Sequence, residues 1–367
     1  MSIDGGETTM RNGLSGVRRI IFSASVTALV MWVLLYAPTP YVVYEPGIAV
    51  PIEPMISLAS GQPADKGQLL LTAVKLTEPN FWHVLKASVD GDKDVYSKDE
   101  VFGSYTKQQY SERLTVIMEG SQNDALEAAY RYLNVPYERK IEAIVVSDVL
   151  TIAGKPAGRL RAGDRLIGLR GGPAFTDVKT AAEAVMKALR EQANTKDGTV
   201  MVTAQRGGEQ LDIELKADLV DNVTSKETPQ QFAELLGVKG FTELRSIKAE
   251  NRLQELHIST DEIGGPSAGL VFALGAVNLL TEGDLTGGVK IAATGTITPE
   301  GKVGVIGGIM QKVVSTDQNG AELFLVPKGN EADAKSKARK MGTSMEIVGV
   351  ESLEEAMDAI ASFLKRR

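Results

Sequence analysis

The chain has 367 residues, of which 43% are hydrophobic and 24% are charged, and its formal net charge is −7. The negative charge and the lack of a long basic run argue against a nucleic-acid-binding protein, because phosphate contacts require a basic surface. The absence of cysteine excludes disulfides and zinc–thiolate sites, and two histidines are too few for a His-rich metal site. The sequence also lacks HExxH and GxxxxGK[ST] motifs, so we expect a folded chain of about two domains without a metal or cofactor.

The N-terminal segment predicts a membrane anchor. Residues 20–37, "IIFSASVTALVMWVLLYA", carry no charge and are long enough to cross a hydrocarbon core of about 30 Å as a helix. Arg18 and Arg19 precede this segment, and the next basic residue is Lys66, so the positive-inside rule predicts that residues 1–19 are a cytoplasmic tail. A cleavable signal peptide is the competing interpretation, but its apolar stretch is usually shorter. We therefore expect a single-pass protein of the cell membrane with most of the chain on the extracytoplasmic side.

Residues 38–134 predict strands followed by helices. The region begins with the proline-rich, strand-like segments "TPYVVYEPGIAVPIEPMISL" and "GQLLLTAVKL". It continues into helical sequence around "KQQYSERLTVIMEG" and "SQNDALEAAYRYLN". No pattern of residues in this region indicates chemistry.

Residues 135–220 predict a β-rich domain with one helix. Turn residues surround the short strand "RLIGLRGG", apolar residues recur at the helical period from Val178 onwards, and "TVMVTAQ" and "LDIELKA" flank a hairpin turn. This order resembles the PDZ domains of bacterial membrane proteases, whose signature GxPAxxxxLxxGDxI begins here at Gly154, with two residues fewer between Ala157 and Leu160. The resemblance implies a domain that captures an extended peptide by strand addition, with a spacer or lid as the alternative.

Residues 221–367 predict alternating strands and helices after the polar linker "DNVTSKETPQQ". A strand ends at His257-Ile258, a helix begins near Ile309, and "AELFLVP" and "SMEIVGV" are further strands separated by a helix. Such alternation indicates an α/β or α+β domain.

The segment "GPSAG", residues 265–269, raises Ser267 as a candidate nucleophile. It fits the GxSxG elbow pattern and stands directly before an apolar, helix-forming run, so a helix-capping serine is the alternative. Hydrolases with that elbow need a histidine after the serine. No histidine follows Ser267 in this chain, which excludes a triad of that type and leaves His257 or a neutral lysine as the base.

Lys312 is the lysine whose sequence environment suits a base. It shares a helical face with Ile309, Val313 and Thr316, and it follows the helix start at Gly307-Gly308 closely. Burial and the positive end of the helix dipole both lower the pKa of its amine, and a neutral amine can accept the serine proton. The alternative is a lysine whose stem packs while its head reaches water.

Longer motifs resemble the proteolytic domain of Lon proteases, namely "IGGPSAGLVFAL", "GDLTGG", "KIAATGTITPEGKVGVIGGIMQKVV" and "GAELFLVP". With the anchor and the PDZ-like region, the chain is similar to the membrane-anchored, PDZ-containing Lon-like serine proteases of bacteria, a group that includes pheromone-processing enzymes. The resemblance implies a Ser-Lys dyad of nucleophile Ser267 and base Lys312, and a threonine, Thr294, whose hydroxyl contacts the lysine. Supporting roles fall to Pro266 at the first helical position and to backbone N–H groups of the turn around Gly265 and Ala268, which would stabilise an oxyanion.

Two departures from Lon accompany this resemblance. The ATPase module and its phosphate loop are missing, so we expect no ATP-driven unfolding of substrates. The acidic residue that many Lon enzymes carry just before the GPS turn is Gly264 here, which puts a role for an acid at that position in doubt.

The expected fold is thus α+β, with an N-terminal transmembrane helix, a PDZ-like β-rich domain over 135–220 and a Lon-type α/β proteolytic domain over 221–367. The expected function is that of an ATP-independent, membrane-anchored serine endopeptidase that cleaves extracytoplasmic peptides or proteins through an acyl-enzyme. Peptide or protein substrates are the expected partners, and the PDZ-like domain is one place where they could dock. The sequence leaves open whether the chain forms a homo-oligomer. A non-catalytic PDZ scaffold and an esterase or amidase with the same dyad are the alternatives.

Overall fold

The computed structural model describes residues 7–61, 66–103, 105–152, 155–192, 198–216, 229–260 and 264–367. The chain forms two compact units. The first consists of the chain up to Glu45 with Lys75–Val101, and the second of Pro46–Val74 with Phe102–Arg367. The turn expected at Gly154 and most of the linker expected from Asp221 lie outside the described residues.

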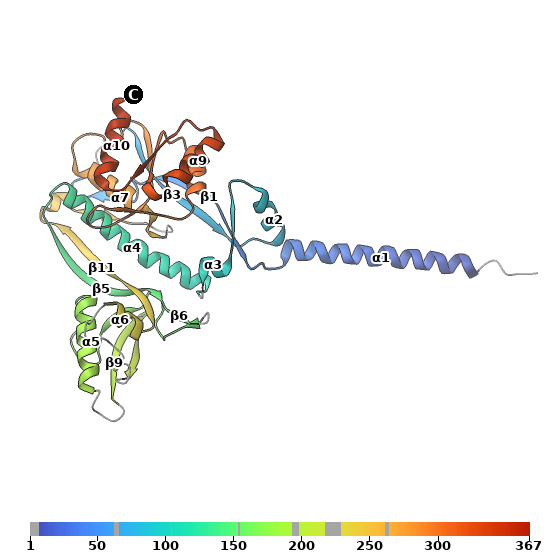
Figure 1. Cartoon of the computed structure of the whole chain (residues 1–367), viewed down its shortest axis with the longest axis horizontal. Helices are drawn as coiled ribbons and strands as arrows, with labels where there is room; N and C mark the ends of the chain where they lie inside the picture. The colour runs from blue at the N-terminus through green and yellow to red at the C-terminus, as the bar shows by residue number, and fades with distance from the viewer. Residues whose placement is uncertain are drawn as a thin grey trace, which may run out of the picture. The chain divides into compact units, whose positions relative to one another are not determined.

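The first unit contains one long N-terminal helix, α1 (Glu7–Tyr36), and the shorter helix α2 (Phe81–Val89). From Arg18 to Tyr36, α1 is long and apolar enough to span a membrane, as the sequence predicted for residues 20–37. Strand β1 (Tyr41–Pro51) follows α1, and its residues 41–44 pair antiparallel with β4 (Asp94–Ser97). Figure 1 shows α2 beside the end of α1.

The second unit is built on a parallel sheet in the order β17-β16-β13-β3. Its strands are β3 (Gln68–Thr77), β13 (Lys290–Ala293), β16 (Leu323–Pro327) and β17 (Glu346–Val350). Every residue of β16 is buried, because parallel strands covered by helices on both faces need apolar side chains on both. The predicted helices appear as α4 (Lys107–Tyr132), α7 (Gly269–Leu280), α8 (Ile309–Gln318), α9 (Glu331–Met341) and α10 (Leu353–Lys365).

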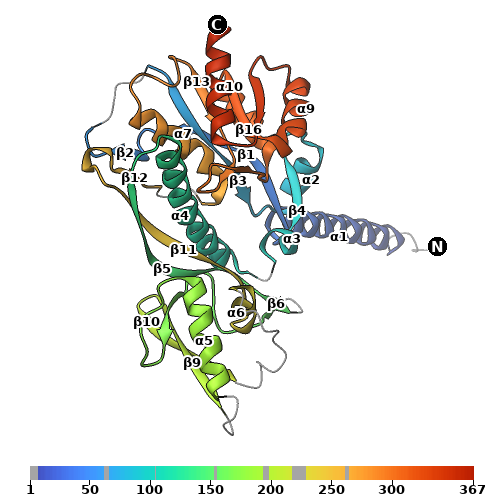
Figure 2. The ribbon, with the colours of Figure 1, turned by 60° about the vertical axis from the view of Figure 1, so that its left-hand side comes forward.

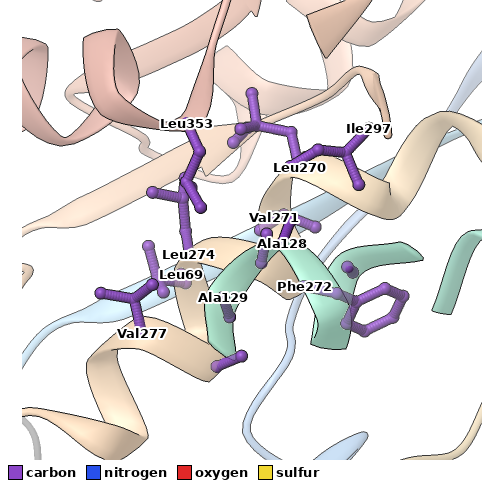
Figure 3. Packing of buried hydrophobic residues seen from close by; sticks show 14 of the residues in the cluster. Leu69, Ala128, Ala129, Leu270, Val271, Phe272, Leu274, Val277, Ile297 and Leu353 are labelled. Carbon is purple, nitrogen blue, oxygen red and sulfur yellow. The ribbon is translucent and has the colours of Figure 1, made fainter. Parts of the chain in front are cut away.

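The helices divide between the two faces of this sheet. Leu69 and Leu71 of β3 point into a core formed with α4, α7 and α10, whereas Leu70 points into a core formed with α8 and α9. Helix α7 is apolar on all sides and buried along most of its length, as expected of a helix at the centre of a domain. Figure 3 shows Val271 and Phe272 of α7 near Ala128 and Ala129 of α4, and Leu270 near Ile297.

A second, antiparallel sheet has the order β10-β9-β8-β5-β11. It consists of β5 (Tyr137–Val149), β8 (Arg165–Leu169), β9 (Thr199–Arg206), β10 (Glu209–Lys216) and β11 (Val238–Ala249), and it packs on α5 (Val178–Gln192) and α6 (Pro229–Leu235). In Figure 2 the long strands β5 and β11 run from the region of α4 to the module around α5 and α6. The predicted hairpin is confirmed, with Glu209 opposite Arg206.

The domain boundaries differ from those predicted at residues 135 and 221. Strand β11 lies beyond residue 220 but is the edge strand of the antiparallel sheet, and Phe232 of α6 is fully buried in its core. In turn, β3 and α4 come from the region 38–134 but belong to the core of the C-terminal strands and helices. The physical reason is that strand β13 needs neighbours on both edges for its backbone groups, and parallel pairing joins segments that are distant in sequence.

The remaining elements are short. They are β2 (Ile56–Leu58), α3 (Lys98–Phe102), β6 (Thr151–Ile152), β7 (Lys155–Pro156), η2 (Arg252–Gln254), β12 (Leu256–Ile258), η3 (Pro266–Ala268), β14 (Thr296–Ile297), β15 (Val303–Gly304) and η4 (Lys328–Asn330).

Candidate active site

The GPSAG segment forms a tight turn that opens α7. Pro266–Ala268 is a single 3-10 turn, and Gly265 before it has φ +97°, a conformation that favours glycine. Helix α4 supports the turn from one side, because the N–H of Gly265 donates to the carbonyl of Leu114 at 3.1 Å and Oγ of Ser121 donates to the carbonyl of Pro266 at 3.1 Å. The backbone just before Ser267 is therefore fixed by hydrogen bonds to α4.

The second glycine of the motif allows α7 to approach its neighbours closely. A Cβ atom at Gly269 would lie 2.8 Å from Oγ of Ser121 and 2.9 Å from Cγ2 of Ile297. On the sheet side, the N–H of Gly295 donates to the carbonyl of Ser267 at 2.8 Å. Ser267 is thus held between α4 and the end of β13.

Lys312 is the fourth residue of α8, which begins directly after Gly308, close to the predicted helix start. Its side chain is 2% exposed, which contradicts the alternative of a head that reaches water. Its Nζ lies 2.8 Å from Oγ of Ser267, 2.9 Å from Oγ1 of Thr294 and 3.0 Å from the carbonyl oxygen of Thr72. The three residues that the sequence singled out, Ser267, Thr294 and Lys312, are therefore in direct contact.

Burial lowers the pKa of Lys312 from 10.5 to about 7, because the charged amine loses its hydration. None of its three hydrogen-bond partners is a carboxylate, so no negative charge among them offsets that loss. A substantial fraction of the amine is consequently neutral near pH 7.

The hydrogen bonds around Nζ suit a neutral amine. The carbonyl of Thr72 can only accept, and Thr294 donates its own hydroxyl proton to the carbonyl of Ser267 at 3.0 Å, so it too accepts from Nζ. A neutral amine has two N–H groups for these two acceptors and one lone pair left. Oγ of Ser267 is the remaining partner and the only one of the three with a proton to give to that lone pair.

The site lies where β3 and β13 continue toward the start of α8. Ala293 pairs with Leu71, so Thr294 and Thr72 are the next residues on two neighbouring parallel strands. Ligands of open parallel sheets bind outside the carboxyl ends of the strands. Thr294 is fully buried, and its N–H donates to the carbonyl of Leu325 at 3.0 Å, which fixes its hydroxyl next to Lys312.

The other residues considered in the sequence take different positions. His257 is exposed on β12, where it pairs with Ser57 of β2. Ala268 is buried behind the turn. At Gly264, a Cβ atom would lie 3.1 Å from Cβ of Leu114, so an acidic side chain there requires α4 to give way. This contact gives a physical reason for the departure from Lon at that position.

Sequence reasoning missed Thr72, Leu114 and Ser121, all from the region in which it found no chemistry. Thr72 and Leu114 act through backbone carbonyls, which leave no signature in the side-chain pattern. Ser121 interrupts the helical sequence of α4 as a small, buried polar residue, which was the one available signal.

A pocket of about 550 Å³ adjoins the turn. It is lined by residues of α4 and of the segment before the turn, namely Ser111, Leu114, Thr115, Met118, Glu119, Gln122, Ile258, Ser259, Thr260 and Gly264. Nε2 of Gln122 donates to Oγ1 of Thr260 at 2.9 Å and joins the two walls. Among the described lining residues, Leu114, Met118 and Ile258 are apolar and Glu119 is charged.

Within the described ranges, no group of three or more His, Asp or Glu side chains is arranged to hold a metal ion. At the site, the hydroxyl of Ser267 and the amine of Lys312 are in hydrogen-bond contact, and groups of these two types can serve as a nucleophile and a base.

Comparison with known proteins finds similarity to Lon proteases in the C-terminal part of the chain. The family model of the Lon protease (S16) C-terminal proteolytic domain matches residues 247–362. The Lon protease of Clostridioides difficile is 36% identical over 94 residues, which are 26% of this chain and 12% of the relative. The Lon protease of Mesomycoplasma hyopneumoniae is 31% identical over 113 residues, 30% of this chain and 13% of the relative.

A longer alignment joins the chain to Lon protease 2 of Herpetosiphon aurantiacus, with 28% identity over 184 residues, 45% of this chain and 22% of the relative. The chain spans less than a quarter of the length of each of these three relatives. The part of the chain that holds Ser267, Thr294 and Lys312 matches the proteolytic domain of the Lon serine proteases.

Proposed function

We propose that the protein is a membrane-anchored serine endopeptidase that hydrolyses peptide bonds through an acyl-enzyme, with Ser267 as nucleophile and Lys312 as general base. The observation that carries the proposal is the distance of 2.8 Å between Nζ of a fully buried lysine and Oγ of Ser267. The match of residues 247–362 to a serine protease domain supports the same chemistry. Hydrolysis needs no ATP in this proposal, which rests on the lack of a GxxxxGK[ST] motif in the sequence.

The proposed reaction moves one proton between Ser267 and Lys312. The neutral amine takes the hydroxyl proton while Oγ attacks the peptide carbonyl, and the resulting ammonium gives that proton to the leaving amine as the C–N bond breaks. Water then repeats the sequence on the acyl ester, so that the acid product leaves and Ser267 regains its proton. Thr294 keeps Nζ aimed at Oγ throughout, since it bonds both Nζ and the carbonyl of Ser267.

Backbone N–H groups at the start of α7 are the proposed stabilisers of the oxyanion. Pro266 has no N–H, so the first N–H of the turn is that of Ser267 itself. The positive end of α7 favours negative charge at the same place. Hydrogen bonds from α4 hold this backbone in place before substrate arrives, which is what preorganised stabilisation requires.

The pocket beside the turn is the proposed position of substrate side chains. Its described lining residues combine apolar side chains with hydroxyl groups and the carboxylate of Glu119. An extended peptide with a basic or polar side chain at this position fits such a lining better than an acidic one does.

The proposed role of the PDZ-like module is to capture peptides along β11. This strand is the edge of its sheet and is open to strand addition in principle. At Arg245, however, the backbone N–H donates to Oδ1 of Asn123 on α4 at 2.8 Å. Peptide addition is thus confined to the part of β11 before Arg245.

In the same proposal, α1 anchors the protein and residues 1–19 stay in the cytoplasm. The length and composition of Arg18–Tyr36 support a span. Substrates are then peptides or proteins on the extracytoplasmic side, near the membrane surface.

The decisive experiment measures acylation and peptide cleavage by the full-length protein and its variants Ser267→Ala, Lys312→Ala and Lys312→Arg. Wild-type protein should form a covalent acyl adduct on Ser267 with an activated ester and should cleave unstructured peptides without ATP. All three variants should do neither while they keep the melting temperature of a folded protein. Ester turnover without any peptide cleavage would replace the endopeptidase by an esterase, and cleavage by folded Ser267→Ala would refute the dyad.

A further inference from the structure

Helix α2 turns an apolar face outwards. Trp82, Leu85 and Val89 are 44%, 57% and 84% exposed, and their spacing of three and four residues places them on one side of the helix. Ala87 on the opposite side is the buried residue of α2. A helix on the surface of a soluble domain presents the reverse arrangement, with apolar residues inward.

One polar residue of α2, His83, contacts a carboxylate of the first unit instead of only solvent. Nε2 of His83 lies 2.7 Å from Oε1 of Glu45, a carboxylate that is largely buried in the first unit. Helix α2 therefore contains polar residues that could face solvent, and Trp82 is exposed although they are present.

The start of α2 is tied to the last turn of α1. The side chain of Asn80 caps α2 by accepting from the N–H of His83 at 2.8 Å, and its amide donates to the carbonyl of Leu35 at 2.9 Å. Figures 1 and 2 both show α2 next to this end of α1. Trp32 and Tyr36, two exposed aromatic residues of α1, lie at the same end, as aromatic residues do where a span leaves the hydrocarbon.

A basic residue completes the exposed face. Lys86 is exposed and its Nζ lies 5.4 Å from the centroid of the Trp82 ring. An aromatic ring and an aliphatic side chain next to a lysine are the composition of helices that lie in the headgroup region, where the lysine reaches lipid phosphates.

We propose that α2 is an interfacial helix whose face of Trp82, Leu85 and Val89 enters the headgroup region of the bilayer that α1 spans. The partner of this face is thus a lipid surface. The inference rests on the anchor role proposed above for α1. Its consequence is that the first unit is held on the membrane at two places, by the span and by a helix parallel to the surface.

The chain offers a direct test, because it contains two tryptophans, Trp32 on α1 and Trp82 on α2. Full-length Trp32→Phe and Trp82→Phe variants are each reconstituted into phosphatidylcholine–phosphatidylglycerol vesicles. Fluorescence quenching is measured with lipids that carry a spin label near the headgroup or near the chain end, and with iodide on both sides of the bilayer. In Trp32→Phe, Trp82 should be quenched by the shallow label more than by the deep one and be shielded from iodide.

Two further variants in the Trp32→Phe background separate insertion from a change of fold. Leu85→Asp places a charge on the exposed face and should make Trp82 accessible to iodide. Ser88→Asp places the same charge outside the line of Trp82, Leu85 and Val89 and should leave the quenching of Trp82 unchanged.

The remaining outcomes distinguish this inference from the anchor itself. Quenching of Trp32 by lipid in Trp82→Phe, together with a Trp82 that only iodide quenches, would overturn the role of α2 and leave the anchor intact. A Trp82 shielded from both lipid and iodide would overturn it in favour of a protein partner or a second copy of the chain. A Trp32 that no lipid label quenches would refute the anchor, and the inference with it.

Discussion

The rate at which Ser267 is acylated should follow the titration of one group, the amine of Lys312. Burial lowers the pKa of this amine from 10.5 to about 7, and only the neutral form can accept the serine proton. Below that pKa the neutral fraction falls about tenfold per pH unit, so acylation at about pH 5 should run at roughly one hundredth of its plateau rate. Above about pH 8 the rate should be almost constant.

The size of the effect follows from the surroundings of the amine. Lowering the pKa from 10.5 to about 7 corresponds to about 5 kcal/mol of lost stabilisation of the ammonium form, at roughly 1.4 kcal/mol per pH unit. The three groups around Nζ, on Thr72, Ser267 and Thr294, are all uncharged and cannot restore it.

The assay is single-turnover acylation by an activated ester, measured by intact mass from about pH 5 to about pH 10. Lys312→Arg should show no acylation at any of these values, because a guanidinium stays protonated. His257→Ala is the control and should keep the wild-type profile, since His257 is exposed on β12. A plateau reached only near pH 10, or acylation by the arginine variant at neutral pH, would refute the assignment of the base.

Three further predictions concern packing, specificity and stability. Gly269→Ala should destabilise the protein by about 1–3 kcal/mol and lower its melting temperature, because the new methyl group would lie 2.8 Å from Oγ of Ser121. Gly91→Ala is the control and should have little effect, because a Cβ atom there has nothing within 4 Å. Equal losses of stability in the two variants would count against the packing argument. Glu119→Lys should shift the kcat/KM ratio between peptides that differ by one lysine or glutamate by about 2- to 5-fold toward the acidic peptide, as a single exposed charge allows, and an unchanged ratio would place the substrate elsewhere. Lys312→Met should be inactive, and its stability relative to wild type should fall as pH rises from about 7 to about 10.5. The reason is that the unfolded wild-type chain binds one more proton than the folded chain in that window, so the wild-type protein gains stability there. Unfolding midpoints of both proteins across this pH range measure the difference, and parallel curves would contradict a lowered pKa of Lys312.

Local sequence patterns were sufficient for most helices and for the β9–β10 hairpin, whereas the contact between Ser267, Thr294 and Lys312 was expected from the resemblance to Lon proteases. The apolar period places Lys312 on the inner face of α8, and the structure has its Nζ against Ser267 and Thr294. Glycines at the turn were also informative, since Gly265 has a positive φ and Gly269 has no room for a side chain.

Pairing between distant segments could not be predicted in the same way. Nothing in "GQLLLTAVKL" indicates that β3 pairs with β13, since any buried parallel strand reads as a similar apolar run. The polar linker near residue 221 suggested a domain boundary, but the chain returns after it to add β11 to the antiparallel sheet. Backbone acceptors such as the carbonyl of Thr72 leave no trace in the sequence at all.

The position of the antiparallel module within the chain has a consequence for folding. Lys312 and its acceptor Thr72 are 240 residues apart, and the whole module from β5 to β11 lies between them. Closing so long a loop costs entropy that no local contact offsets until β3 and β13 pair, and such non-local pairing is slow. All strands of the module lie between Tyr137 and Ala249, so it can form first and reduce the loop to a compact insert whose ends, β5 and β11, lie side by side. Assembly of the proposed catalytic pair would then be a late event in the folding of this chain, and the proposed activity would appear only after the inserted module had folded.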